Sequence, residues 1–184
     1  ARAVAVVARR GGTGTRRVRA LGNDRGMSCD LGRLARDAEG SLGLDLAAVR
    51  LLNGSMVLER ASLTLLQKLL RGPLGPVVAR FVSERMFRWQ FARIFSAAHP
   101  IGADEANDAW SLLAFQDGHR ISDRLTYYLH ERIRFADRWH GALRDWSGSL
   151  EIAWGMKDPV CTKAVLDAGT QLRPTAPVTP LFAP

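Results

Sequence analysis

One stretch, residues 18–28, most constrains what this chain can fold into. Its sequence is VRALGNDRGMS, in which an apolar run stops at Gly22 and a segment compatible with a helix begins after Gly26. These two glycines lie two residues before and two residues after Asp24. Small residues at that spacing permit a sharp strand-to-helix turn whose central residue has strained backbone. The pattern therefore predicts that Asp24 projects from the end of a strand, beside the N–H groups of a helix N-terminus.

Two interpretations of this turn remain open from these residues alone. A carboxylate at the apex of such a turn can act as a nucleophile and form an ester intermediate. The same residues also fit an ordinary turn, because Asn-Asp followed closely by Gly favours turns and because Asp24 or Asp30 could cap the helix N-terminus. Evidence from the rest of the sequence is needed to decide between a turn that presents a nucleophile and an ordinary turn.

Length and composition indicate a folded domain. The chain has 184 residues, of which 47% are apolar, so it can bury a core and is not expected to be disordered. No apolar run approaches the ~20 residues that span a bilayer. The two cysteines, Cys29 and Cys161, indicate neither a disulfide framework nor a metal site. We therefore expect no metal, no cofactor, no membrane partner and a reducing, cytoplasmic location.

The chain is basic, with a formal net charge of +8. Its arginines are mixed with Asp and Glu along the predicted helices, which is typical of a solvated surface. Only residues 9–19, RRGGTGTRRVR, form a dense basic block, and we predict that residues 1–15 are a flexible basic segment. Nucleic acid is therefore not the expected partner, although a basic module that uses residues 9–19 on RNA or DNA remains an alternative.

The residues around the turn predict a parallel sheet. Residues 16–22 and 46–52 read as strands, and residues 27–38 between them carry apolar side chains at helical spacing. Strand, helix and strand in succession form a βαβ unit with a right-handed crossover. Asp24 and Asn53 both fall at the carboxyl ends of these strands, where chemistry is found in such sheets.

The middle of the chain is predicted to be a helical insertion. Residues 55–146 consist of amphipathic segments with polar, Gly- and Pro-containing connections, and we interpret this block as a lid. Residues 149–154 return to strand character, and Pro159 forces Asp158 out of helical geometry at the end of that strand. The expected domains are residues 16–54 for the first part of the core, 55–146 for the helical cap and 147–184 for the last core strand, helix and Pro-rich tail.

Taken in order, these stretches resemble the α/β-hydrolase superfamily, in its haloalkane dehalogenase and epoxide hydrolase branch with an aspartate nucleophile. Within that branch they are most similar to the mesoderm-specific transcript-like subgroup. The resemblance covers about residues 16–178 and rests on GNDRGMS, VRLLNGSMVLE, QKLLRGPLGPVVARF, FQDGHRI, YYLHERIRFADRW and AWGMKDPV. It implies an α/β fold in which a partial, parallel α/β-hydrolase sheet carries a large helical lid inserted between strands.

The resemblance also implies roles for particular residues. Asp24 matches the nucleophile, the backbone N–H of Arg25 matches an oxyanion donor, and Asp158 matches the acid that orients a catalytic histidine. Some relatives carry that acid at the position of Asn53 instead. The lid tyrosines and tryptophan are expected to shape the pocket, although packing within the lid is the alternative for them. The implied substrate-contacting residues are Asn53, Tyr127, Tyr128 and Trp139.

A small organic molecule, such as a haloalkane, an epoxide or an ester, is the substrate that the resemblance implies. Asp24 would attack it to form an ester, which a histidine-activated water would cleave. The histidine of the relatives follows the last strand in a stretch like GxGHxP, and residues 173–184 contain no histidine. The four histidines lie instead in the predicted lid, at positions His99, His119, His130 and His140.

Other differences also set this chain apart from the relatives. Asn23 stands where histidine is common, and Arg25 stands where Trp or Met is common and could pair with Asp24. The first strands of the sheet have no counterpart, so the chain is expected to be truncated at both ends and to self-associate through an exposed sheet edge. We therefore expect an impaired hydrolase, and the alternative is a non-catalytic, truncated relative.

Overall fold

The computed structural model describes residues 5–10, 16–95 and 99–182, and these form two compact units. The sheet unit contains the described residues up to Ala61 together with Glu131–Phe182. The helical unit contains Ser62–His130. In the described part of the chain, no helix is long and apolar enough to cross a membrane.

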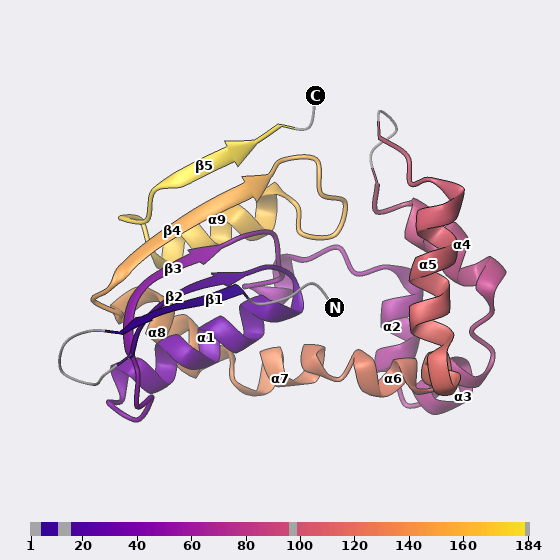
Figure 1. Ribbon diagram of the computed structural model, residues 1–184, viewed down its shortest axis with the longest axis horizontal. Helices are drawn as coiled ribbons and strands as arrows, with labels where there is room; N and C mark the ends of the chain where they lie inside the picture. The colour runs from indigo at the N-terminus through magenta and orange to yellow at the C-terminus, as the bar shows by residue number, and fades with distance from the viewer. Residues whose placement is uncertain (1–4, 11–15, 96–98, 183–184) are drawn as a thin grey trace. The chain divides into compact units, whose positions relative to one another are not determined.

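The sheet unit is built on five strands in the order β1-β2-β3-β4-β5 (Figure 1). Strands β2 to β5 are parallel to one another, and β1 is antiparallel to β2. The strands are β1 (Ala5–Arg10), β2 (Arg16–Gly22), β3 (Asp45–Leu51), β4 (Ser149–Gly155) and β5 (Val178–Leu181). The predicted parallel α/β fold is therefore confirmed.

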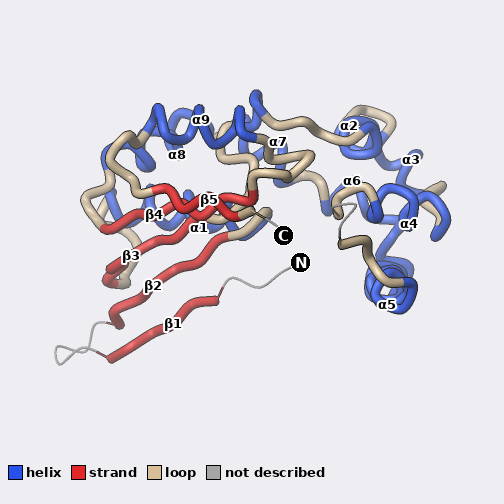
Figure 2. The backbone as a smooth tube through the Cα atoms, turned by 90° about the horizontal axis from the view of Figure 1, so that it is seen from above, coloured by secondary structure: helices blue, strands red, loops and turns tan. Residues whose placement is uncertain are grey.

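Three helices, α1 (Arg25–Ala38), α8 (Ala136–Asp145) and α9 (Lys163–Leu172), lie on one face of this sheet (Figure 2). Along β4 the buried residues alternate, as expected for a strand with one face on the core. A short 3₁₀ segment, η1 (Leu58–Arg60), follows β3. The core includes Met27, Leu31, Leu34, Val49, Leu51, Leu143, Ile152, Trp154 and Val165.

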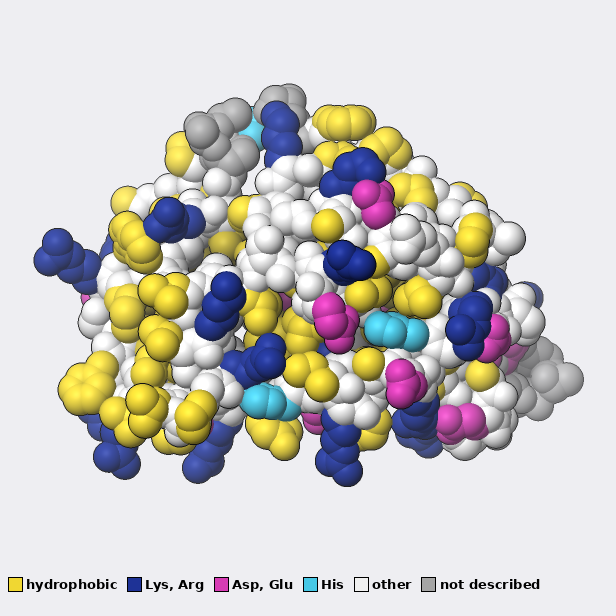
Figure 3. Space-filling model, turned by 180° about the vertical axis from the view of Figure 1, so that it is seen from behind, with side chains coloured by type: hydrophobic (Ala, Val, Ile, Leu, Met, Phe, Trp, Pro, Cys, Tyr) yellow, Lys and Arg dark blue, Asp and Glu magenta, His cyan; other side chains and the backbone are white. Residues whose placement is uncertain are grey.

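The helical unit has a much smaller core, centred on Leu70, Ala79 and Val82. Large apolar side chains remain exposed on it, among them Phe81 and Leu112. Figure 3 shows hydrophobic side chains gathered among Lys and Arg side chains at the left of the view. Its elements are α2 (Leu65–Arg71), α3 (Gly75–Arg80), α4 (Glu84–Ala92), α5 (Ala103–Ala114), the 3₁₀ segment η2 (Phe115–Ile121) and α6 (Ser122–Leu125). Helix α7 (Tyr128–Arg134) contains the boundary between the two units.

The structure corrects the predicted end of the lid. We expected the cap to cover residues 55–146, but the helical unit ends at His130 and α8 belongs to the sheet unit. The reason is the apolar face of α8, on which Trp139 and Leu143 are buried in the core that α1 also lines. Hydrophobic burial against α1 therefore decides where this helix packs.

The structure also corrects the two ends of the chain. Within the segment 1–15 that was predicted to be flexible, Ala5–Arg10 form β1 and pair with β2, while residues 1–4 and 11–15 lie outside the described residues. The expected Pro-rich tail contains β5, which pairs with β4. In both places the neighbouring strand supplies unpaired backbone N–H and C=O groups, and these bind a segment whose pairing the sequence did not predict.

Candidate functional site at the carboxyl end of the sheet

The turn between β2 and α1 has the strained backbone that the sequence predicts. Asp24 has φ 48° and ψ −110°, a conformation that is rare for a residue with a side chain, and the residue is exposed. Strain of this kind costs on the order of 1–3 kcal/mol and persists only where the surroundings hold it. The N–H of Asp24 donates to the main-chain oxygen of Asn53 at 2.7 Å, which fixes the turn against the end of β3.

Close packing explains the small residues around this turn. A Cβ at Gly22 would lie 2.2 Å from Oδ2 of Asp30 and 3.2 Å from Cα of Met27. A Cβ at Gly54 would lie 3.0 Å from Sδ of Met27 and 3.2 Å from the main-chain oxygen of Asp24. No side chain fits at Gly22 without movement of its neighbours, so the glycine is required there by sterics.

The helix-capping interpretation of the turn is wrong. Asp24 occupies the N-cap position of α1, but its side chain accepts no capping hydrogen bond. Asp30 lies further along α1, fully buried, with Oδ1 bound to Arg33 and Oδ2 without a hydrogen-bond partner among the described residues. Burial raises the pKa of the Asp30 carboxyl, and Arg33 opposes that rise only in part.

Hydrogen bonds of Asn53 also connect the end of β3 with the end of β4, in addition to the bond from Asp24 at the end of β2. The side-chain Nδ2 of Asn53 donates to the oxygen of Gly155 at 3.0 Å, and the N–H of Gly155 donates to Oδ1 of Asn53 at 2.6 Å. The N–H of Asp158 in turn donates to the oxygen of Gly155 at 3.3 Å. Asp24 and Asp158 therefore both lie at the carboxyl end of the parallel sheet. The contact of Asn53 with substrate stays a prediction, and its amide is bound to backbone.

Asp158 is held in a defined orientation in the loop that follows β4. Its Oδ1 accepts hydrogen bonds from the N–H groups of Val160 at 2.8 Å and Cys161 at 2.7 Å. These bonds orient the carboxyl group, which leaves Oδ2 as the oxygen with which to bind a partner. This is the arrangement expected of an acid that orients another side chain, a role that remains a prediction for Asp158.

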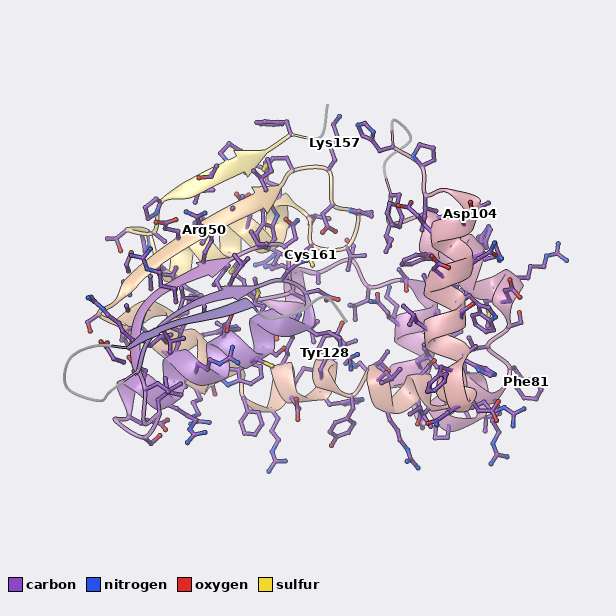
Figure 4. All side chains as sticks on the ribbon, viewed as in Figure 1. Arg50, Phe81, Asp104, Tyr128, Lys157 and Cys161 are labelled. Carbon is purple, nitrogen blue, oxygen red and sulfur yellow. The ribbon has the colours of Figure 1, made fainter. Side chains whose placement is uncertain are left out.

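The pKa of the buried Cys161 thiol depends on the charged groups of the site. Burial raises the pKa of Cys161 to about 12, the carboxylate of Asp158 acts in the same direction, the guanidinium of Arg132 opposes it, and Asp24 adds a further upward contribution. Both carboxylates are therefore within electrostatic reach of one sulfur atom. Figure 4 shows Cys161 in the loop after β4, at the carboxyl end of the sheet.

Arg132 is a site residue that the sequence analysis missed. It is 4% exposed, and it donates to Oγ of Ser28 at 2.8 Å, to the main-chain oxygen of Asp24 at 2.6 Å and to Oγ of Ser55. A signal was available in the spacing, because Arg132 follows the buried Leu129 by three residues and precedes the buried Trp139 by seven. A cation at an apolar position of a helical stripe is a candidate for a specific buried role.

The other predicted site residues have different surroundings. Arg25 is the first residue of α1, next to Asp24, and its oxyanion role remains a prediction. Tyr127 is exposed and Tyr128 is partly buried, and both belong to the helical unit. Trp139 is 7% exposed and packs in the core of the sheet unit, so its expected place in the lid is wrong.

The described histidines make other contacts. Nε2 of His130 lies 3.1 Å from the oxygen of Arg71, and Nε2 of His140 lies 3.0 Å from the oxygen of Met56. His119 packs its ring against Trp110 in the helical unit. Over the described ranges, no group of three or more His, Cys, Asp and Glu side chains could hold a metal ion.

Comparisons with known sequences identify relatives of the chain, although no family model matches it. A protein of Mycobacterium tuberculosis (strain ATCC 25618 / H37Rv) with the name "Putative hydrolase LipZ" is 53% identical over 161 residues, which are 88% of this chain and 56% of that protein. The mesoderm-specific transcript protein of Mus musculus is 30% identical over 152 residues, 81% of this chain and 45% of that protein. The chain spans about half the length of these curated relatives.

Solved structures show the fold. A crystal structure of an α/β-hydrolase fold protein from Burkholderia ambifaria matches 89% of this chain and 57% of its own, with a TM-score of 0.60 and 12% identity. A structure described as a "putative aryl esterase" from Burkholderia cenocepacia matches 89% of this chain and 54% of its own, with a TM-score of 0.54 and 15% identity. The predicted α/β-hydrolase fold is therefore confirmed, and at these identities the likeness extends to the fold alone.

Proposed function

We propose that this chain carries the nucleophile and the orienting acid of an α/β-hydrolase active site that acts on a small organic substrate. Asp24 is the proposed nucleophile and Asp158 the proposed orienting acid. The observation that carries the proposal is the backbone of Asp24, which is strained, exposed and placed between a strand end and a helix N-terminus. The similarity to LipZ, whose name describes a hydrolase, supports the same reaction class.

The first proposed step forms an ester on Asp24. A carboxylate oxygen attacks a substrate carbon, a carbon–oxygen bond forms, the carbon–halogen bond breaks, and the halide leaves with the bonding electrons. With an epoxide, the ring carbon–oxygen bond breaks and the ring oxygen takes a proton from water. Haloalkanes and epoxides are the proposed substrates, with esters as a further class.

The second proposed step is attack of water on the carbonyl carbon of that ester. A base takes a proton from the water, the bond between the carbonyl carbon and the ester oxygen breaks, and the substrate leaves as an alcohol that takes up the proton, which regenerates the Asp24 carboxylate. The developing oxyanion would be stabilised by N–H groups at the start of α1, of which Arg25 supplies the first. This step needs a base held by Asp158, and the Nε2 atoms of His130 and His140 are already close to main-chain oxygens. We therefore propose that ester forms on this chain faster than it is hydrolysed, so that the adduct accumulates.

Mass spectrometry of the full chain after incubation with 1-bromobutane or styrene oxide tests this proposal. We expect one carboxylate adduct per chain, located by peptide mapping at Asp24 and counted separately from any alkylation of the exposed Cys29 thiol, and no carboxylate adduct at that peptide in Asp24→Asn. Asp45→Asn is the matched control, because Asp45 is an exposed carboxylate on β3 that pairs with Arg17. It should be labelled at Asp24 like the wild type.

The opposite result favours the second candidate, a non-catalytic relative. The observation behind that candidate is the engagement of His130 and His140 with backbone. A folded wild-type chain that gains no more adduct than Asp24→Asn would reject the nucleophile. Labelling spread evenly over exposed carboxylates, with Asp45→Asn losing as much as Asp24→Asn, would reject it equally.

A further inference from the structure

The guanidinium of Arg132 lies against the main chain of the proposed nucleophile. Arg132 comes from α7, and its side chain is 4% exposed. Charged side chains are rarely so buried unless specific partners hold them. Its partners here belong to the segment that forms the turn at Asp24, the helix that follows it and the loop after β3.

Two hydrogen-bond donors bind the main-chain oxygen of Asp24. The α1 hydrogen bond from the N–H of Met27 to this oxygen is long, at 3.3 Å. Nη2 of Arg132 donates to the same oxygen at 2.6 Å. Charge-assisted hydrogen bonds of this kind are shorter and stronger than neutral ones. Arg132 is therefore the closer of these two donors to the strained peptide group.

Two further donors of Arg132 bind the segments on either side of the turn, α1 and the loop after β3. Nε donates to Ser28, on the first turns of α1, and Nη1 donates to Ser55, two residues after Asn53. Gly54 lies between these contacts, where a Cβ would come within 3.2 Å of the Asp24 oxygen. One planar group thus connects the nucleophile's own backbone with the helix and the loop that flank it, in the fixed fork geometry of a guanidinium.

We propose that Arg132 is the positioning residue of the turn, which holds the strained backbone of Asp24 in the conformation that presents its carboxylate to substrate. The inference rests on the proposed nucleophilic role of Asp24. The physical link is direct, because the carbonyl that Arg132 binds belongs to the residue whose φ and ψ aim the side chain. Without this bond the peptide group can rotate and relieve the strain, and the carboxylate then loses its orientation.

Alkylation kinetics of the full chain with 1-bromobutane test the proposal. Arg132→Met keeps length and burial but removes the donors, and we expect its maximal alkylation rate at Asp24 to fall by about tenfold or more with a half-saturating probe concentration within about twofold of wild type. Arg132→Lys, which retains a cationic donor, should recover the rate to within about threefold of wild type. A role in overall stability alone would not produce this pattern in folded protein.

Arg138→Met is the matched control. Arg138 lies on α8, six residues along the chain, and it pairs on the surface with Glu39. Its loss should leave the alkylation rate unchanged. Equal slowing by Arg132→Met and Arg138→Met would overturn the proposal, as would a wild-type rate in Arg132→Met.

Hydrogen exchange supplies a readout that does not depend on alkylation. In Arg132→Met, amides of residues 22–31 should exchange faster, while those of α9 should keep their wild-type rates. If the wild-type chain is not alkylated, the nucleophile proposal fails and this comparison alone judges Arg132. If Arg132→Met does not fold, Ser55→Ala takes its place, because it removes a partner of Arg132. Unchanged exchange at residues 22–31 in Ser55→Ala would then overturn the inference.

Discussion

Replacement of Gly22 by alanine is the sharpest test of the packing at the strand-to-helix turn. The new Cβ would lie 2.2 Å from Oδ2 of Asp30 and 3.2 Å from Cα of Met27. The first contact is shorter than any that carbon and oxygen accept, so Asp30 or the start of α1 must move. Overpacking of this kind costs about 1–3 kcal/mol, and we expect a value of about 3 kcal/mol because a fully buried carboxyl has little room to move.

The expected loss is large enough to measure by thermal unfolding. For a chain of this length, about 3 kcal/mol corresponds to a fall of about 6–12 °C in Tm. Circular dichroism of the full chain gives this value, and urea unfolding gives the free energy independently. If Gly22 supports the proposed site, Gly22→Ala should also slow alkylation of Asp24 at temperatures where the variant is still folded.

A matched substitution on α1 should change the free energy of unfolding in the opposite direction. A Cβ at Gly32 would meet only Nε1 of Trp139, at an ordinary 3.9 Å. Alanine inside a helix is favoured over glycine by about 0.5–1 kcal/mol, so we expect Gly32→Ala to raise the free energy of unfolding. This control separates the specific clash at Gly22 from a general effect of a methyl group on the sheet unit.

A double-mutant cycle identifies the atom that causes the clash. Asp30→Ala removes the oxygen that the new Cβ would meet, so the double variant Gly22→Ala/Asp30→Ala should be more stable than the sum of the single effects predicts, by at least about 1 kcal/mol. Strictly additive effects, or a Gly22→Ala variant with wild-type stability, would refute the described packing of the turn.

Three further predictions concern the same edge of the sheet and the helix behind it. Asn53→Ala removes two hydrogen bonds to Gly155 and should cost about 1–2 kcal/mol, visible as a lower Tm; an unchanged Tm would show that the amide is not structural. A thiol reagent at about pH 8 should modify the exposed Cys29 in the native chain, and the buried Cys161, with a pKa of about 12, only after unfolding; two reactive thiols in the native state would contradict this. Because burial raises the pKa of the Asp30 carboxyl, the folded state binds this proton more tightly than the unfolded chain does. The stability of the wild type relative to Asp30→Asn should therefore fall as the pH rises above about 4, the ordinary range of an aspartate, and a pH-independent difference in urea unfolding would refute this.

Local rules were enough to predict the turn at Asp24. A strained residue between a strand and a helix needs small neighbours, and this need is visible in the spacing of Gly22 and Gly26 around it. The flanking elements follow equally local periodicities, so the predicted strand over residues 16–22 agrees with β2, and the predicted helix over residues 27–38 agrees with most of α1. The order of these elements also predicted the parallel pairing of β2 and β3.

Edge pairing was less accessible from sequence. The segment Ala5–Arg10 has β-like character only at its apolar start, up to Val7, and its pairing was not predicted, while Pro180 would ordinarily weaken a strand assignment for residues 178–181. Both segments nevertheless pair at the edges of the sheet. The partner strand supplies the hydrogen-bonding groups there, and no property of the segment itself reveals that a partner is adjacent.

The carboxylates at the strand ends could be predicted from the sequence, because strand, turn and helix depend on residues a few positions apart. The groups that surround these carboxylates come from distant parts of the chain and depend on the tertiary fold. Ser28 and Arg132 are separated by 104 residues. The sequence predicts that α8 belongs to the cap, whereas its apolar face is buried in the core that α1 also lines. An arginine on a helix is usually exposed to solvent. Arg132 becomes part of the site because folding places the distant turn at Asp24 against it. In that buried environment its hydrogen bonds are stronger than they would be in water.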